Sequence, residues 1–331
     1  MRSAPRLLAP LLLSALALAC AASLLIGSAG FSPGEVLRAL FGEGDARTVT
    51  IVRGLRLPRA LLGALVGGSL ALSGASLQSL LGNPLADPYL LGVSGGAACG
   101  TLLALVAGLP SSGGLMGSIA LPAAGLMGAL AAVLLVGLGA SVHGRLDRGR
   151  LLLSGVVVNA LASAVLLFLL SFGDSSRTQS FVFWMLGSLA GATPNAVAAL
   201  LIYALLGLAV LLPLSRALDA LTLGEETATT LGIPVERVKR LAYLAASLLA
   251  AAAVAHAGVI GFVGLIVPHL VRRFVRTHRL LLLLSFACGA ALLVSADVVA
   301  RTLFAPAEIS VGAVTALLGA PVFLMLLRRQ A

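Results

Sequence analysis

The stretch LAYLAASLLAAAAVAHAGVIGFVGLIVPHLV, residues 241–271, contains no Asp, Glu, Lys or Arg and has basic residues on both sides. If basic loops stay in the cytoplasm, the chain must cross the membrane and return within these 31 residues. They supply about 46 Å of helix, which is too little for two full crossings of a ~30 Å hydrocarbon core. We therefore expect a short or broken helix near His256-Ala257-Gly258, covered by protein or lining a cavity.

The whole chain has the composition of a membrane protein. It is 60% hydrophobic and 10% charged, with a mean hydropathy of +1.10, whereas soluble domains carry about 25% charged residues. Its 22 basic residues, against 12 acidic ones, cluster between apolar runs, which is typical of membrane topology. We therefore expect an all-α polytopic membrane protein in contact with a lipid bilayer, and no nucleic-acid partner.

Charge-free stretches, divided at turn-forming clusters, predict about ten spans within one membrane domain over residues 1–331. The predicted spans are 7–30, 60–82, 90–108, 115–140, 151–172, 194–214, 238–256, 258–272, 280–298 and 308–327. Placing both termini in the cytoplasm leaves 15 basic residues on that side and seven outside. Spans two to five and seven to ten then enter from opposite sides, which suggests an inverted repeat. A further short helix is expected near Phe181–Ala192.

The cytoplasmic loop 216–238 contains a predicted helix of its own. Thr222-Leu223-Gly224-Glu225 has the spacing of a capping box, and Gly232 suits the position after a helix that ends at Leu231. Such a rigid helix is suited to transmit movement from a cytoplasmic partner, although an ordinary structured loop is the alternative. On the other side, Arg56-Leu57-Pro58-Arg59 opens a span, and its arginines could bind carboxylates of a partner or anchor the chain at the interface.

The sequence lacks the signals of an enzyme. Lys239 is the single lysine and follows no phosphate-binding loop, and no metal-ligand cluster or Ser-His-Asp spacing stands out. We therefore expect no cofactor, no bound metal and no ATP hydrolysis by this chain. Asp87, Asp297 and Glu308 fall at span ends, whereas ion-coupled carriers keep an acidic residue in mid-span. A partner is thus expected to supply the energy. The alternatives are a secondary carrier or channel acting alone and a membrane-anchored enzyme.

Several ordered motifs resemble the FecCD family, the permeases of ATP-driven importers for iron-siderophore, haem and cobalamin. The likeness extends over nearly the whole chain from about residue 50. The motifs are Arg56-Leu57-Pro58-Arg59, Gly74 and Gln78, Asn83-Pro84-Leu85-Ala86-Asp87-Pro88, Leu91-Gly92-Val93-Ser94, Trp184, Gly187-Ser188-Leu189, Leu223-Gly224-Glu225-Glu226, Leu231-Gly232, Gly261-Phe262-Val263-Gly264-Leu265-Ile266-Val267-Pro268-His269 to Arg272, Ala296-Asp297 to Arg301, and Gly319-Ala320-Pro321.

This resemblance implies the type II ABC importer permease fold and a transport role in the bacterial inner membrane. It implies that two copies of the chain surround a path, and that two ATPase subunits and a periplasmic binding protein complete the importer. The permease would pass a metal chelate (haem, cobalamin or a ferric siderophore) from the binding protein to the cytoplasm.

The resemblance also implies residue roles. Arg56, Arg59 and Arg301 would pair with acids of the binding protein, Asn83 and Leu85 would belong to the cytoplasmic gate, and 187–192 would form the outer gate. The ATPase contact would comprise Leu223, Gly224, Glu225, Glu226, Leu231 and Gly232. Two departures are expected to matter locally: Ser310 replaces the usual Pro and would soften the start of the last span, and Arg276-Thr277-His278-Arg279 lacks the usual Gly-Asp before His.

Overall fold

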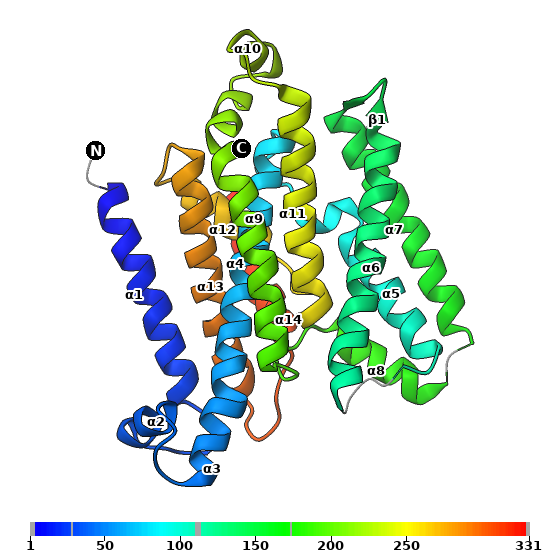
Figure 1. Ribbon diagram of the computed structural model, residues 1–331. Coiled ribbons are helices and arrows are strands. Elements are labelled where there is room, and N and C mark those ends of the chain that lie inside the picture. Colours follow the sequence, from blue (N-terminus) through cyan, green and yellow to red (C-terminus); the bar gives the residue numbers. More distant parts are fainter. Residues whose placement is uncertain (1–3, 28, 110–113, 173, 329–331) are drawn as a thin grey trace.

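The computed structural model describes residues 4–27, 29–109, 114–172 and 174–328, and its regular structure is almost entirely helical (Figure 1). Seven of its helices are long and apolar enough to cross a membrane, and three shorter helices are also apolar. Each of the ten predicted spans overlaps one of them. These are α1 (Ala4–Leu25), α4 (Leu57–Leu81), α5 (Val93–Val106), α6 (Gly114–Ala140), α7 (Arg148–Leu170), α9 (Pro194–Leu221), α11 (Val235–Ala257), α12 (Val263–Arg272), α13 (His278–Thr302) and α14 (Val311–Arg328).

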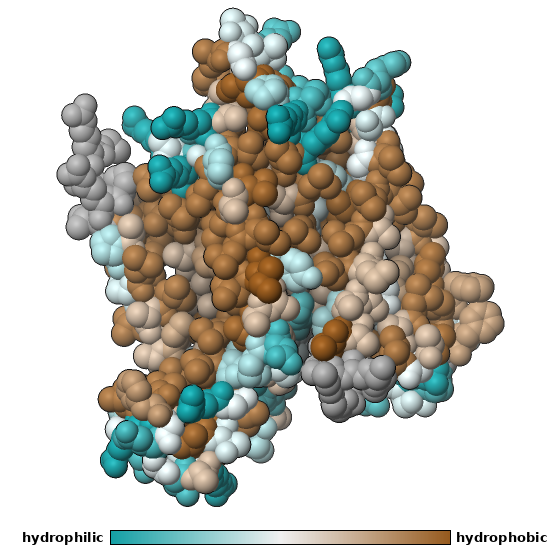
Figure 2. All heavy atoms as spheres, in the orientation of Figure 1, coloured by the Kyte–Doolittle hydropathy of each residue, from teal (hydrophilic) through white to brown (hydrophobic). Residues whose placement is uncertain are grey.

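A broad apolar band crosses the face of the molecule seen in Figure 2. Figure 2 shows hydrophobic side chains over the middle of the visible face and hydrophilic side chains at its two ends. Leu138 on α6 and Leu317 on α14, for example, are 73% and 75% exposed. Water would not tolerate so large a continuous apolar surface, whereas lipid would. The chain is therefore a multi-pass membrane protein.

The helices form two groups that meet at α11. In Figure 1, α5, α6, α7 and α8 (Ser175–Met185) lie on one side, and the remaining long helices lie on the other. The central helix α11 contacts α4 and α9 in one group and α5 and α6 in the other. Helix α4 is buried along almost all of its length and contacts both α12 and α13.

The predicted break near His256-Ala257-Gly258 is confirmed. Helix α11 ends at Ala257, Gly258 has a φ of +71°, and α12 starts only at Val263 and is ten residues long. The segment between them is nevertheless buried at Ile260. A break in the backbone at this depth is thus covered by the rest of the protein.

Short elements close the two ends of the bundle. At the end that carries the start of α1 lie α10 (Glu225–Thr230) and a hairpin of β1 (Ser141–Val142) and β2 (Arg145–Leu146) (Figure 1). The opposite end carries α8, α2 (Pro33–Leu40) and α3 (Ala46–Val49). A π-helix, η1 (Thr50–Arg56), leads into α4, and a 3₁₀ turn, η2 (Pro88–Leu91), precedes α5.

Several predicted boundaries differ from the observed ones, and two of the differences have a clear physical reason. Helix α9 continues seven residues beyond position 214, so the start of the predicted loop 216–238 is helical. Its last turns remain in helix because Leu218 and Leu221 are buried against the bundle. Helix α8 ends at Met185 rather than near Ala192, because Gly187 has a φ of +73° and the chain turns there. The inverted repeat stays a prediction.

Candidate functional site

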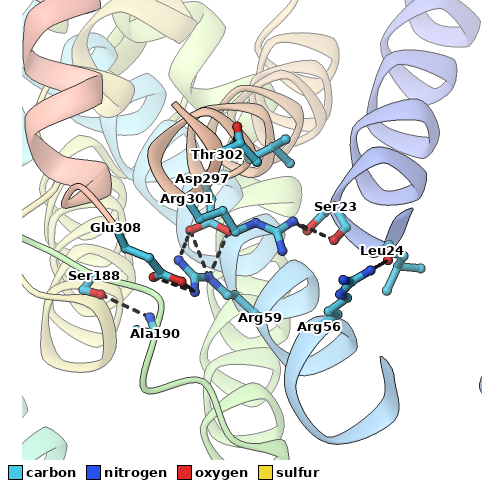
Figure 3. Close-up of polar contacts among 11 residues, drawn as sticks. Ser23, Leu24, Arg56, Arg59, Ser188, Ala190, Asp297, Arg301, Thr302 and Glu308 are labelled. Carbon is cyan, nitrogen blue, oxygen red and sulfur yellow. Dashed lines mark hydrogen bonds and ion pairs between the residues drawn. The ribbon is translucent and has the colours of Figure 1, made fainter. Parts of the chain in front are cut away.

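An ion-pair cluster lies where α4, α13 and the loop before α14 meet (Figure 3). The guanidinium of Arg59 donates through Nε and Nη2 to the carboxylate of Asp297, with a distance of 2.9 Å from Nη2 to Oδ1. Its Nη1 lies 3.0 Å from Oε2 of Glu308. Asp297 is only 1% exposed, so its buried charge depends on this bidentate partner.

Arg301 joins the same cluster to α1. Its Nη2 donates to the carbonyl and the hydroxyl of Ser23, at 2.6 Å and 2.9 Å, and its Nε lies 3.6 Å from Oδ2 of Asp297. Asp297 and Arg301 are four residues apart on α13, a spacing that places side chains on one helix face. This i, i+4 spacing is the feature of the sequence from which the contact between Asp297 and Arg301 could have been predicted.

Arg56 points away from Arg59, although the two are only three residues apart (Figure 3). It is 5% exposed, and its guanidinium donates to the backbone carbonyls of Leu24, Leu25 and Ala29. The carbonyls of Leu24 and Leu25 are among those that the end of α1 leaves without intrahelical partners. Arg56 thus stabilises the end of α1.

The three predicted docking arginines nevertheless surround one cavity of about 370 Å³. Glu308 and the loops at Gly27 and Ala190 complete its wall. Together with the adjacent Asp297, the residues around this cavity comprise three arginines and two carboxylates. Each arginine has a partner within the chain. A docking role would therefore require exchange of partners.

The predicted gate residues occupy the turn between α4 and η2. Gly82, whose φ is +63°, directly follows the last residue of α4, and the side chain of Asn83 accepts a hydrogen bond of 2.9 Å from the backbone N–H of Leu85. This Asx turn fixes a compact, partly exposed loop at the end of a buried helix.

Directly after this turn, Asp87 and Tyr89 fix the path of the chain. The Asp87 carboxylate accepts from the backbone N–H of Tyr89, and burial raises the pKa of Asp87 to about 6. The phenol of Tyr89 donates to the carbonyl of Ile260 at 2.8 Å, and Asn159 on α7 donates to the carbonyl of Tyr89. A mainly apolar cavity of about 590 Å³ adjoins these residues and reaches Phe262.

The loop after α9 contains the predicted helix but not the predicted capping box. Thr222 donates to the carbonyl of Asp219, and α10 starts after Gly224 without a side-chain cap. The carboxylate of Glu225 instead lies 2.9 Å from Nε of Arg148 and 3.0 Å from Nζ of Lys239. The capping prediction was wrong because Glu225 has charged partners that are distant in sequence.

The far end of α10 agrees with the sequence. Gly232 has a φ of +78° at the position after the helix, as predicted. Leu223 and Leu231 flank α10 and are 69% and 64% exposed, so this short helix presents apolar side chains at the end of the bundle. Such a surface suits a protein contact.

Comparison with known proteins assigns the chain to a family. The model of the FecCD transport family matches residues 15–329. The chain belongs to the FecCD transport family. This FecCD protein is 46% identical to the "Cobalamin import system permease protein BtuC" of Halobacterium salinarum, over 87% of this chain and 76% of that one. It is 43% identical to the "Hemin transport system permease protein HmuU" of Yersinia pestis, over 83% and 82%.

A solved structure supports the same FecCD fold. "An inward-facing conformation of a putative metal-chelate type ABC transporter" superposes with a TM-score of 0.86 at 32% identity, and the match covers 98% of this chain and 99% of that one. The predicted resemblance and the type of fold are therefore confirmed, and the chain is an importer permease of the FecCD type. Within the part of the chain that the structure describes, no group of three His, Cys, Asp or Glu residues could hold a metal ion.

Proposed function

We propose that this permease carries a metal chelate across the bacterial inner membrane and that a partner ATPase drives it. The observation that carries the proposal is α10, a short helix with exposed leucines at the end of a bundle whose sequence has no nucleotide-binding loop. The relatives named for cobalamin and hemin, and the metal-chelate title of the solved neighbour, support this substrate class.

The proposed complex contains two copies of this chain, two ATPase subunits at α10 and one periplasmic binding protein at the opposite end. The excess of basic residues in the loops on the α10 side supports a cytoplasmic location for that side and for both termini. Leu223, Gly224, Glu226, Leu231 and Gly232 form the proposed ATPase contact.

The proposed mechanism is alternating access. ATP binding draws the two ATPase subunits together, and the α10 helices move with them. The turn at Asn83 and Leu85 then opens or closes the cytoplasmic end of the path, while the segment 187–192 acts at the outer end. The 590 Å³ cavity near Asp87 and Asn159 supports this path, because it combines an apolar wall with a few polar groups.

The binding protein is proposed to dock at the cavity that Arg56, Arg59 and Arg301 surround. Its carboxylates would replace Glu308, which is 47% exposed in its side chain, as a partner of Arg59. Arg56 contributes to this surface by fixing the end of α1.

Reconstitution tests the function. The permease would be co-purified with its ATPase, inserted in liposomes and supplied with binding protein on one side and ATP on the other. Uptake of radiolabelled cobalamin, haem or a ferric hydroxamate that requires ATP and the ATPase is the expected result. Uptake by the permease alone, with no ATPase present, would show a secondary carrier or channel and overturn the proposal.

A further inference from the structure

One carboxylate of α10 contacts side chains of two other helices of the membrane domain. Glu225 is the first residue of α10, and its two oxygens face different cations: Oε1 faces Arg148, and Oε2 faces Lys239. Arg148 is the first residue of α7, and Lys239 lies in the second turn of α11. One side chain therefore connects three helices.

The cations that hold Glu225 are themselves fixed. Lys239 is 3% exposed, and its Nζ also lies 2.7 Å from the carbonyl of Leu146 and 2.7 Å from Oε1 of Glu236. Glu236 accepts in turn from the backbone N–H of Leu146 at 2.8 Å. The hairpin of β1 and β2 is thus attached to α11, and it leads directly into Arg148.

Arg148 also reaches the end of α4. Its Nη1 lies beside Gly82, where a Cβ would come within 3.1 Å of that nitrogen. Gly82 follows the last residue of α4 and directly precedes the gate turn at Asn83. The guanidinium of Arg148 therefore lies between α10 and the gate turn, with Glu225 on one side and Gly82 on the other.

Glu226, the next residue, has different surroundings from Glu225. It is exposed, and it lines the open groove between α10 and the start of α11. Its side chain is free to meet a partner subunit, whereas the carboxylate of Glu225 already contacts two cations.

From this arrangement we propose that Glu225 does not bind the ATPase but transmits the movement of α10, through Arg148, to the start of α7 and to the gate turn. Arg148 is a positioning residue for the gate. This inference rests on the proposed function, because it concerns how ATPase movement reaches the path. When α10 moves, the ion pair moves Arg148 with it, and the side chain beside Gly82 shifts against the end of α4.

The test measures substrate transported per ATP hydrolysed in the proteoliposomes described above. The probe is the cobalamin, haem or ferric hydroxamate that the wild type takes up. We expect E225Q and R148Q each to lower this ratio at least about fivefold while ATP hydrolysis continues, since a coupling free energy of about 1 kcal/mol corresponds to that factor. R148K should recover part of the ratio because it keeps the charge. The matched control R150Q, at an exposed arginine two residues further along α7, should keep the wild-type ratio.

The double variant R148Q/E225Q gives the second readout. If the two residues act as one connection, the double variant lowers the ratio no further than either single variant. Equal ratios for R148Q and R150Q, or a double variant whose loss is the product of the single losses, would overturn the inference. Failure of E225Q to assemble with the ATPase, while R148Q still assembles, would place Glu225 in the ATPase contact and would also overturn the inference. A wild type without ATP-dependent uptake would instead overturn the proposed function.

Discussion

The imidazole Nδ1 of His278 lies 2.6 Å from Oδ1 of Asp219, and the backbone N–H of His278 donates to the same oxygen. Asp219 belongs to the last turn of α9, and His278 is the first residue of α13. The other ring nitrogen of His278 contacts the hydroxyl of Ser79 on α4, to which Arg272 also donates. This network, in which His278 and Ser79 are buried and Asp219 is partly exposed, fixes α4, α9, α12 and α13 just before the chain enters α10.

Removing Asp219 should destabilise this junction. In D219A, the buried imidazole and a backbone N–H lose their acceptor, which costs about 1–3 kcal/mol. D219N keeps an acceptor oxygen and should lose less. Unfolding of the purified permease in detergent measures both changes, with E43A as a control at an exposed carboxylate. Equal stability of D219A and E43A would contradict the structural role.

The exposed acid of the arginine cluster offers a test of docking. Glu308 occupies Nη1 of Arg59, so E308A should free that nitrogen and tighten binding of an acidic partner, with little loss of stability. R59Q should weaken binding. It should also destabilise the chain by about 3–5 kcal/mol, because Asp297 would lose its bidentate partner. Surface-plasmon measurement of binding-protein affinity, together with detergent unfolding, separates the two effects. An affinity unchanged in E308A and in R59Q would place the docking site elsewhere.

Ser310 should prove stabilising, contrary to the expected softening of the last span. Its hydroxyl donates to the carbonyl of Leu186 at 2.6 Å and accepts from the N–H of Ala313, so it caps α14 and holds the segment after α8. S310A should cost about 1 kcal/mol and speed amide exchange in residues 187–192. S180A, at a serine of α8 whose hydroxyl donates to a carbonyl of the same helix, is the control. Unchanged exchange in S310A would refute this link.

Asp87 should give the protein a characteristic pH dependence. Its pKa rises from 3.8 to about 6 in the folded state, so the folded protein holds this proton more tightly than the unfolded chain. Stability therefore falls as the pH rises from about 4 to 6, by about 3 kcal/mol at 1.36 kcal/mol per pKa unit. D87N keeps the acceptor for the N–H of Tyr89, and its stability should not show this fall between about pH 4 and 6. Parallel profiles of wild type and D87N in detergent would show the prediction to be wrong.

The long apolar helices were predictable because each is encoded by a local run of apolar residues. Their ends were less so, since contacts between helices decide them: buried Leu218 and Leu221 extend α9 past the charged Arg216. The sequence placed Arg56 and Arg59 one turn apart and therefore together. The structure separates them, because carbonyls at the end of α1 are better placed partners for Arg56.

The polar networks were the least predictable part. Ser79, Asp219 and His278 come from three distant segments, so no spacing in the sequence indicates their contact. Their arrangement is that of a hydrolase triad, yet Ser79 is 3% exposed and its hydroxyl bonds within α4, so no substrate carbonyl could reach it. Geometry and access decide such a role, and neither is written in local sequence.

The backbones of α4 and α12 touch where Gly74 meets Gly264, and a methyl group on Gly74 would overlap the carbonyl oxygen of Gly264. Gly67 and Gly289 form a similar contact between α4 and α13. Helices in such close contact cannot repack by moving side chains, and one helix axis cannot slide past the other. During a transport cycle, we therefore expect α4, α12 and α13 to move as one rigid body. Bending would then occur at the turns at Gly82 and Gly258.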